Sequence, residues 1–207
     1  MQDVIQHFIE NIRQTTPLEY IAVIAGIISV WFSKKENILV YPIGLINTLA
    51  YVYLSISQSL FGEASVNLYY TIMSIYGWLL WSKKDMSRKP VLHITYSSAR
   101  EWLNQILFFL FFYVSIFLAL TWAKQEFYAN TLPFLDAFAS ASAFTGMWLM
   151  TRKKVESWYW WIITNILSMP LYFMKDYVLT SVYYFILLVL AIMGLIAWRK
   201  KANRGGY

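Results

Sequence analysis

The chain has 207 residues, of which 59% are hydrophobic and only 14% are charged, and its formal net charge is +6. Soluble domains average about a quarter charged residues, so this composition indicates an integral membrane protein. The chain has no cysteine, which excludes disulfides, thiolate metal sites and thiol nucleophiles. Its histidines, His7 and His93, are far apart in the sequence. We therefore expect no enzymatic activity, no cofactor and no metal site.

The N-terminal segment has the pattern of a short helix that lies on the membrane surface. Apolar residues recur there at helical spacing between polar ones, at Val4, Ile5, Phe8, Ile9 and Ile12. This spacing predicts an amphipathic helix within residues 1–17. Acidic residues in the same segment do not fit the basic and then apolar plan of a signal peptide.

Charged residues divide the rest of the chain into apolar segments, each near the length of about 20 residues that a helix needs to cross a bilayer. The seven predicted spans are about 18–34, 38–57, 62–82, 101–122, 132–151, 157–174 and 178–199. Glu19 and Asp136 stand near the starts of two spans, where an acid is stabilised by the helix dipole. The expected fold is an all-α membrane protein with seven transmembrane helices.

Lysine and arginine are distributed unevenly between the two sides of the predicted membrane helices. If the N-terminus is outside, 14 of the 17 basic residues fall on the cytoplasmic side. The other 3 are Arg13, Lys124 and Lys175. Cytoplasmic loops carry an excess of basic residues, so the sequence predicts an outside N-terminus and a cytoplasmic C-terminus. We interpret the basic residues as solvated residues at helix ends and expect no nucleic-acid partner.

Two parts of the chain resemble each other. In each copy an acid precedes a tryptophan by twelve residues, a basic turn ending in an acid follows, and Gly-x-x-x-Trp ends the third helix. The matched landmarks are Glu19, Trp31, Glu36, Tyr41, Gly77 and Trp81 in one copy, and Asp136, Trp148, Glu156, Trp161, Gly194 and Trp198 in the other. Two three-helix repeats in the same orientation need one connecting helix. We therefore expect a 3+1+3 plan of parallel repeats, as in sugar transporters of the SWEET type, with a pathway between the repeats.

This plan divides the chain into five regions. They are an amphipathic surface helix (1–17), a first three-helix repeat (18–84), a cytoplasmic loop with connecting helix 4 (85–131), a second three-helix repeat (132–201) and a short cytoplasmic tail (202–207).

The sixth predicted span carries the strongest indication of a ligand site. Trp158, Trp161 and Asn165 are spaced i, i+3 and i+7, which places two indole rings and one amide on one helix face. A polar side chain at this depth usually faces a bundle interior or a cavity. The alternative roles are an interfacial aromatic belt for the tryptophans and an interhelical hydrogen bond for the amide. We favour the pathway for Trp161 and Asn165, and both roles stay open for Trp158.

The third predicted span repeats this chemistry with Asn67, Tyr70, Ser74 and Trp78 at helical spacing. Aromatic faces and amides suit a flat, polar, cationic heterocycle, because the rings attract the cation and an amide both donates and accepts hydrogen bonds. Asn47 in the second span fits either a ligand contact or an interhelical bond. Further candidate substrate-binding residues, at the start of the seventh span, are Thr180, Tyr183 and Tyr184.

Two of these motifs resemble the PnuC family of bacterial vitamin transporters. One is the run from Trp148 to Trp158 followed by Trp161 and Asn165, and the other is Tyr76-Gly77-Trp78-Leu79-Leu80-Trp81. The resemblance covers about residues 18–201. It implies an inner-membrane facilitator, or uniporter, of nicotinamide riboside that assembles as a homotrimer. It also implies that a cytoplasmic kinase drives net uptake by phosphorylating the vitamin.

The same resemblance bears on individual residues. Trp161 and Asn165 match the family's ligand-contacting tryptophan and asparagine. Asn67 stands where many riboside-transporting members have glutamine, and the run Asn67-Leu68-Tyr69-Tyr70 is similar to a branch that resembles thiamine transporters. The resemblance therefore implies nicotinamide riboside as the first expectation and thiamine as the second.

Two other classes of protein fit the sequence less well. A non-transporting seven-helix receptor would not need the internal repeat, and a membrane enzyme would need paired intramembrane acids or histidines. No Gly-rich phosphate-binding motif is present, so we expect no use of ATP by this chain. Trp198, next to Arg199, is expected to be an interfacial anchor.

Overall fold

The computed structural model describes residues 16–57, 61–126, 132–174 and 178–205. Within these ranges the chain forms seven α-helices. Their bounds are α2 Pro17–Lys34, α3 Val40–Ser57, α4 Phe61–Ser82, α5 Ala99–Glu126, α6 Pro133–Thr151, α7 Ser157–Met174 and α8 Val178–Asn203. Each predicted span is confirmed as a helix. The predicted surface helix lies outside the described residues, except for Thr16 and Pro17, which begin α2.

The starts of α2 and α6 follow from local sequence signals. Thr16 caps α2 by accepting a hydrogen bond at Oγ1 from Glu19 N at 3.2 Å. Pro17 and Pro133 stand at the first helical positions, where a missing N–H costs nothing. Glu19 and Asp136 lie in the first turns of their helices, as predicted.

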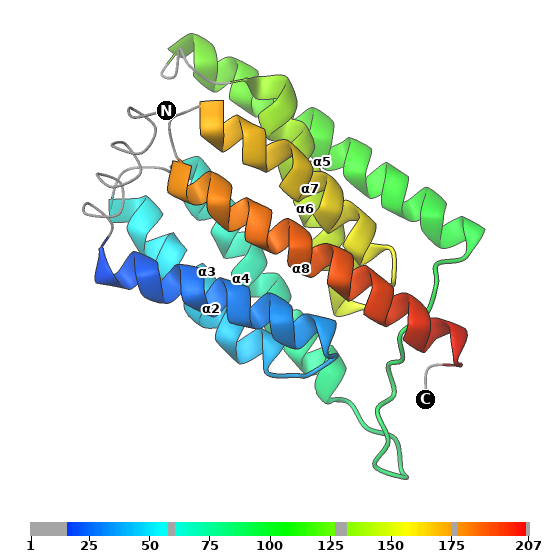
Figure 1. Ribbon diagram of the computed structural model, residues 1–207. Helices are drawn as coiled ribbons and strands as arrows, with labels where there is room; N and C mark the ends of the chain where they lie inside the picture. Colours follow the sequence, from blue (N-terminus) through cyan, green and yellow to red (C-terminus); the bar gives the residue numbers. More distant parts are fainter. Residues whose placement is uncertain (1–15, 58–60, 127–131, 175–177, 206–207) are drawn as a thin grey trace.

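Six of the seven described helices pack in a closed ring, and one lies outside it. Neighbours in the ring follow the order α2, α3, α4, α6, α7, α8 and back to α2. The remaining described helix, α5, lies along α6 and forms one edge of the bundle (Figure 1), and its Gln105 and Phe109 side chains also contact Trp160 of α7. The interior of the ring is therefore the space in which side chains of opposite helices meet.

α6 lies close to three described helices, α4, α5 and α7. Small residues occupy most of its buried positions, which are Ala137, Ala139, Ala141, Ser142, Ala143, Thr145 and Gly146 among others. Small side chains let helix backbones approach closely in a membrane.

Four of the described helices, α2, α3, α5 and α8, are long and apolar enough to cross a membrane, judged by length and composition. The other three, α4, α6 and α7, have more polar side chains or more small buried ones. Each of these three helices contributes to the interior of the ring, where polar side chains are tolerated.

The turns that end α2 and α6 have the same conformation. Glu36 has φ 59° and Lys153 has φ 52°, both in the left-handed region. Glu36 N donates to Ser33 O, and Lys153 N donates to Met150 O in the same way. The two copies are thus related by a shift of 117 residues, the separation of Glu36 and Lys153.

This shift corrects the predicted alignment of the copies within the turn. Glu36 corresponds to Lys153 and not to Glu156, and Tyr41 corresponds to Trp158 and not to Trp161. The acid of the second turn has a different task, because Glu156 accepts hydrogen bonds from Ser97 N and Ser97 Oγ at 2.9 and 2.8 Å. The predicted alignment of Glu36 with Glu156 is therefore wrong, because the two acids are not at equivalent positions.

We call the helices α2–α4 and the helices α6–α8 the two halves of the ring. Two tryptophans connect these halves beside the turns that end α2 and α6. Trp81 Nε1 donates to Thr151 O, and Trp198 Nε1 donates to Ser33 O, both at 3.1 Å. Each bond runs from the third helix of one half to the first helix of the other. Trp198 is 0% exposed, so the expected interfacial anchor is wrong. Its indole lies inside the bundle, because its N–H donates a hydrogen bond to the buried carbonyl of Ser33.

The bundle therefore has two different ends. We call the end with the turns after α2 and α6 and with Asn203 the basic end; it also holds the segment that connects α4 to α5 (Figure 1). We call the opposite end, where α2, α4 and α6 begin with Glu19, Glu63 and Asp136, the acidic end.

Candidate functional site

Aromatic side chains from three helices meet inside the ring. The ring centroid of Tyr70 in α4 lies 6.2 Å from that of Trp161 in α7 and 6.0 Å from that of Phe144 in α6. Because α4 and α7 are not neighbours in the ring, the contact between Tyr70 and Trp161 crosses its interior. Tyr69 stacks on Phe144 with centroids 4.1 Å apart and donates a hydrogen bond to its carbonyl. The structure thus brings two predicted site residues together.

Asn165 lies one helical turn from Trp161, toward the acidic end, and is 2% exposed. Its Oδ1 atom is buried without a hydrogen-bond partner among the described residues. A buried acceptor left unpaired costs about 1–3 kcal/mol. The corresponding residue of the first half, Thr48, is satisfied, because its hydroxyl accepts a hydrogen bond from Thr71 Oγ1 at 3.0 Å. The unpaired acceptor therefore belongs to one half only, and a ligand that donates a hydrogen bond would satisfy it.

Asn67 and Ser74 lie on the same face of α4 as Tyr70. Asn67 Nδ2 donates to the Glu63 carbonyl at 3.0 Å, which turns the amide back along its own helix. Ser74 is 3% exposed, and an added Cβ at Gly44 of α3 would lie 3.9 Å from its Oγ. These side chains extend the face of Tyr70 in both directions, Asn67 toward the acidic end and Ser74 toward the basic end.

Tyr184 and Thr180 lie one turn apart on α8 and are partly buried. The Tyr184 ring stacks on Tyr172 of α7 with centroids 5.2 Å apart, and it lies 5.7 Å from Tyr183. Under the shift of 117 residues, Tyr184 corresponds to Asn67 and Thr180 to Glu63. The two candidate faces of α4 and α8 are therefore equivalent in the two halves.

Asn47 has the structural role that was one of its two predicted roles. Its Nδ2 donates to Ala22 O of α2 at 2.8 Å. Thr164, the corresponding residue in the second half, donates from Oγ1 to Ala139 O of α6 at 3.4 Å. Both bonds tie the second helix of a half to its first helix, as expected of polar side chains between membrane helices.

Trp158 lies one helical turn closer to the basic end than Trp161, in a buried cluster of aromatic residues against which Trp161 packs. It is 1% exposed, and its ring meets Trp198 edge to face with centroids 5.5 Å apart. Its six-membered ring fills the space that a side chain at Gly194 would need. Its Nε1 has no partner among the described residues.

Sequence reasoning missed three aromatic residues of the interior. Tyr69 and Phe144 each meet Tyr70 edge to face, and Tyr172 stacks on Tyr184. Tyr69 carried a signal, since it directly precedes Tyr70. The sequence gives no such signal for Phe144 and Tyr172, because an aromatic residue in an apolar helix can face either the lipid or the interior of the ring without any difference in the sequence.

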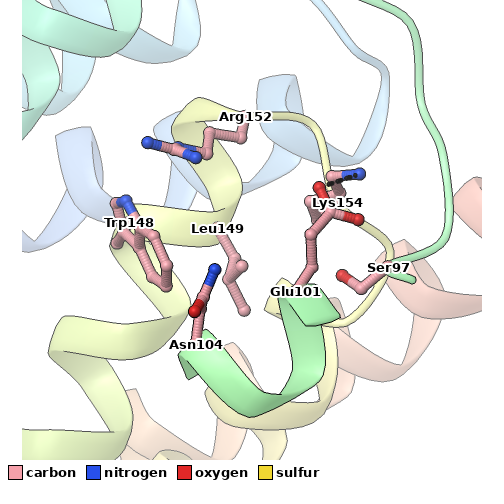
Figure 2. A pocket seen from close by; sticks show the side chains of 7 residues that line it. All are labelled: Ser97, Glu101, Asn104, Trp148, Leu149, Arg152 and Lys154. Atoms are coloured by element: carbon pink, nitrogen blue, oxygen red, sulfur yellow. Dashed lines mark ion pairs between the residues drawn. The ribbon is translucent and has the colours of Figure 1, made fainter. Parts of the chain in front are cut away.

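A shallow hollow of about 250 Å³ lies at the basic end, outside this aromatic and amide site. Figure 2 shows its lining, which is Ser97, Glu101, Asn104, Trp148, Leu149, Arg152 and Lys154. Lys154 pairs with Glu101 at 2.8 Å, and the Arg152 guanidinium lies 4.9 Å from the centre of the Trp148 ring. Its two cations and one carboxylate suit a cationic ligand less well than the interior does. Over the ranges that the structure describes, no three His, Asp or Glu side chains gather to hold a metal ion.

A closed ring of helices, several of them apolar enough to cross a membrane, with aromatic and amide side chains in its interior, is the architecture of a multi-pass membrane protein with a candidate ligand site. The chain belongs to the family described as nicotinamide mononucleotide transporter, whose model matches residues 16–200, and it is therefore a membrane transporter and not an enzyme.

Individual relatives agree with this assignment. The nicotinamide riboside transporter PnuC of Escherichia coli is 26% identical over 91% of this chain and 87% of its own length. The PnuC protein of Neisseria mucosa is 27% identical over 75% of this chain and 59% of its own length. The riboflavin/roseoflavin transporter RibM of Streptomyces davaonensis is 20% identical over 87% of this chain and 84% of its own length. A crystal structure of the vitamin B3 transporter PnuC shares the fold, with a TM-score of 0.70, 24% identity, and coverage of 97% of this chain and 88% of that chain.

Proposed function

We propose that the protein is a uniporter that carries nicotinamide riboside across the bacterial inner membrane. Relatives named as nicotinamide riboside transporters support this substrate. The observation that carries the proposal is the unpaired, buried Oδ1 of Asn165 beside the Trp161 and Tyr70 rings. Nicotinamide riboside has a flat cationic ring, which aromatic faces attract, and amide and hydroxyl donors, which an unpaired acceptor needs.

We also propose the 3+1+3 topology, with parallel repeats at 18–84 and 132–201, helix α5 as the connecting helix of region 85–131, and a homotrimeric assembly. The position of α5 outside the ring supports this plan, and so does the matching of the two helix-ending turns. The basic end is then cytoplasmic, which puts the tail 202–207 inside and the surface helix 1–17 outside.

Transport then proceeds by rocking of one half against the other around the central site. The bonds from Trp81 to Thr151 and from Trp198 to Ser33 close the cytoplasmic end, and they must break for release. All acids whose side chains are described lie in first helical turns or in connecting segments at the basic end. A proton or sodium site normally needs acids within the membrane, so we propose that uptake is driven instead by cytoplasmic phosphorylation of the vitamin.

Thiamine is the second candidate substrate. The run Asn67-Leu68-Tyr69-Tyr70 favours it, because this run is similar to a branch of the family that resembles thiamine transporters. Asn67 also departs from the glutamine of many riboside transporters, and its amide, one methylene shorter, reaches less far toward a ligand. Thiamine is also a flat cation with a polar arm, so the Trp161 and Tyr70 rings suit both vitamins. A receptor that does not transport is disfavoured, because it would not need two halves that can rock.

Calorimetric titration of the purified protein with nicotinamide riboside, thiamine and riboflavin tests the substrate. We expect nicotinamide riboside to bind at least tenfold more tightly than either of the other vitamins. Liposomes test the mechanism: labelled riboside should equilibrate, and it should accumulate only when a riboside kinase and ATP are enclosed. Tighter binding of thiamine would show that thiamine, and not nicotinamide riboside, is the substrate. Accumulation of the riboside driven by an imposed proton or sodium gradient would contradict the proposed uniport mechanism.

A further inference from the structure

Glu63 stands at the acidic end of the helix face that carries the candidate site of α4. Glu63, Asn67, Tyr70 and Ser74 are spaced i, i+4, i+7 and i+11, so they form one stripe along the helix. The hydrogen bond from Asn67 Nδ2 to Glu63 O, at 3.0 Å, joins the first two members. Since Tyr70 reaches Trp161 across the ring, the stripe faces the interior. Glu63 is therefore the member of this stripe that lies nearest the acidic end.

The charge of Glu63 acts across the mouth of the ring. Its carboxylate interacts electrostatically with the phenols of Tyr51 in α3, Tyr172 in α7 and Tyr184 in α8. Neither α7 nor α8 is a neighbour of α4 in the ring, so two of these interactions cross the interior. Glu19 interacts with Tyr51 only, and Asp136 with Tyr172 only, among these three phenols. Among the acids of this end whose side chains are described, Glu63 therefore acts on phenols of the most helices.

The two halves of the ring differ at this position. The residue that corresponds to Glu63 in α8 is Thr180, a neutral hydroxyl. At this pair of equivalent positions, a ligand at the mouth therefore meets a carboxylate on α4 and a neutral hydroxyl on α8. The sequence on this side of the membrane helices is acidic as a whole, with seven acidic and three basic residues. A negative mouth with low-dielectric walls concentrates cations.

A second observation, deeper on the same path, also points to a ligand. Asn165 Oδ1 is unpaired and buried, and Asn165 shares its helix face with Trp161, the ring that meets Tyr70 of the stripe. A ligand that enters past Glu63 and reaches the Trp161 ring comes next to this acceptor. The charge at the mouth and the acceptor in the interior therefore belong to one path.

We propose that Glu63 makes this transporter selective for cationic vitamins, by attracting and orienting the positive ring before it reaches Trp161 and Tyr70. The proposal rests on the proposed transport of a charged vitamin and adds a residue that recognises the charge. The binding affinity of neutral molecules of the same shape should not depend on the charge of Glu63.

Nicotinamide riboside and its dihydro form test the role of charge, because addition of a hydride makes the ring neutral with little change in shape. The Kd of each probe is measured by calorimetry for the wild-type protein and for the Glu63→Gln, Glu63→Asp and Glu101→Gln variants. Glu101 lies at the opposite end, so Glu101→Gln is matched for net charge. We expect Glu63→Gln to weaken binding of the cation about tenfold, which is about 1.4 kcal/mol. We expect less than a twofold change for the neutral probe.

Three further results are expected. Glu63→Asp should keep most of the preference for the cation, and Glu101→Gln should keep all of it. The Kd of the cation should rise with salt in the wild-type protein and rise less in Glu63→Gln. Equal losses of affinity for both probes, or no loss of affinity for the cation in monodisperse Glu63→Gln protein, would overturn this inference. Either result would leave the proposed transport function standing. If the wild-type protein binds neither probe, the proposed substrate falls and the inference falls with it.

Discussion

Glu36 and Lys153 occupy equivalent positions in the two halves of the ring, and their side chains meet in an ion pair of 2.7 Å. Lys201 adds a second contact to Glu36 at 2.8 Å. Both turn residues are in the left-handed region, which costs a non-glycine residue about 1–2 kcal/mol. The ion pair accounts for the absence of glycine at both positions, because only side chains can join the halves there.

We expect the stability of the protein to fall in acid because of this ion pair. Burial alone would raise the pKa of the Glu36 carboxyl, but hydrogen bonds and charges from Lys153 and Lys201 bring its pKa below the ordinary value of 4.5. The folded state therefore binds the proton less readily than the unfolded state does. The stabilisation is fully present above pH 4.5 and is lost as the pH falls through the lower folded-state pKa.

Thermal unfolding of the wild-type protein and of Glu36→Gln at neutral pH and at about pH 3.5 measures this loss. The wild-type protein should be more stable at neutral pH, and the difference in Tm should shrink by about 2 °C or more in acid. A difference that stays constant across this range would show that the Glu36 charge does not stabilise the fold.

Replacement of Trp161 by alanine should weaken ligand binding, whereas replacement of Trp198 should weaken the fold. Loss of a desolvated cation–π contact at Trp161 should cost about 2 kcal/mol, or roughly thirtyfold in Kd. Trp198 is fully buried and hydrogen-bonded to Ser33 O, so Trp198→Ala should cost about 3–5 kcal/mol of stability. Titration and thermal unfolding of both variants separate the two effects. Similar affinity losses in folded protein would place the ligand elsewhere.

Asn165 and Asn47 are a matched pair of amides with opposite expected effects. Asn165→Leu should weaken binding at least about tenfold without lowering Tm, because it removes an acceptor that has no partner. Asn47→Leu removes the hydrogen bond that ties α3 to Ala22 O of α2 and should cost about 0.5–1.5 kcal/mol of stability, with affinity unchanged within about threefold. A large fall in Tm for Asn165→Leu would make that amide structural, and the proposed site would lose its acceptor.

Alanine at Gly77 or Gly194 should destabilise the basic end. An added Cβ at Gly77 would overlap the Tyr41 ring, and one at Gly194 would overlap the Trp158 ring. Such overpacking costs about 1–3 kcal/mol. Gly62→Ala is the control, because no atom lies within 4 Å of its added Cβ, and it should be neutral or slightly stabilising. Equal Tm values for Gly62→Ala and Gly77→Ala would show that the rings move aside freely.

The helices could be predicted almost entirely from the sequence. Charged residues cannot lie in hydrocarbon without a large cost, so the gaps between them determined where the spans begin and end. Caps such as Thr16 and first-turn acids such as Asp136 are local signals, and the structure confirmed both spans that they open. The likeness of Gly77 to Gly194 and of Trp81 to Trp198 was also readable, since the residue types are the same in both copies.

The arrangement of the site depended on the tertiary structure. Helical spacing placed Trp158 and Trp161 on one face of α7. In the fold, however, Trp158 packs against Gly194 at the basic end, whereas Trp161 contacts Tyr70 across the interior. Periodicity gives the direction of a side chain relative to its own helix and carries no information on which helix lies opposite.

The same limit explains the two amides and the turn acids. Asn47 and Asn165 look alike in the sequence, and only the neighbouring carbonyl of Ala22 makes the first a structural bond. Glu36 and Glu156 look alike as well, yet Glu36 pairs with Lys153 across the ring and Glu156 binds Ser97. The sequence determined which polar groups must find a partner, because burial in a membrane leaves no water to satisfy them. Closure of the ring decided which partner each group found.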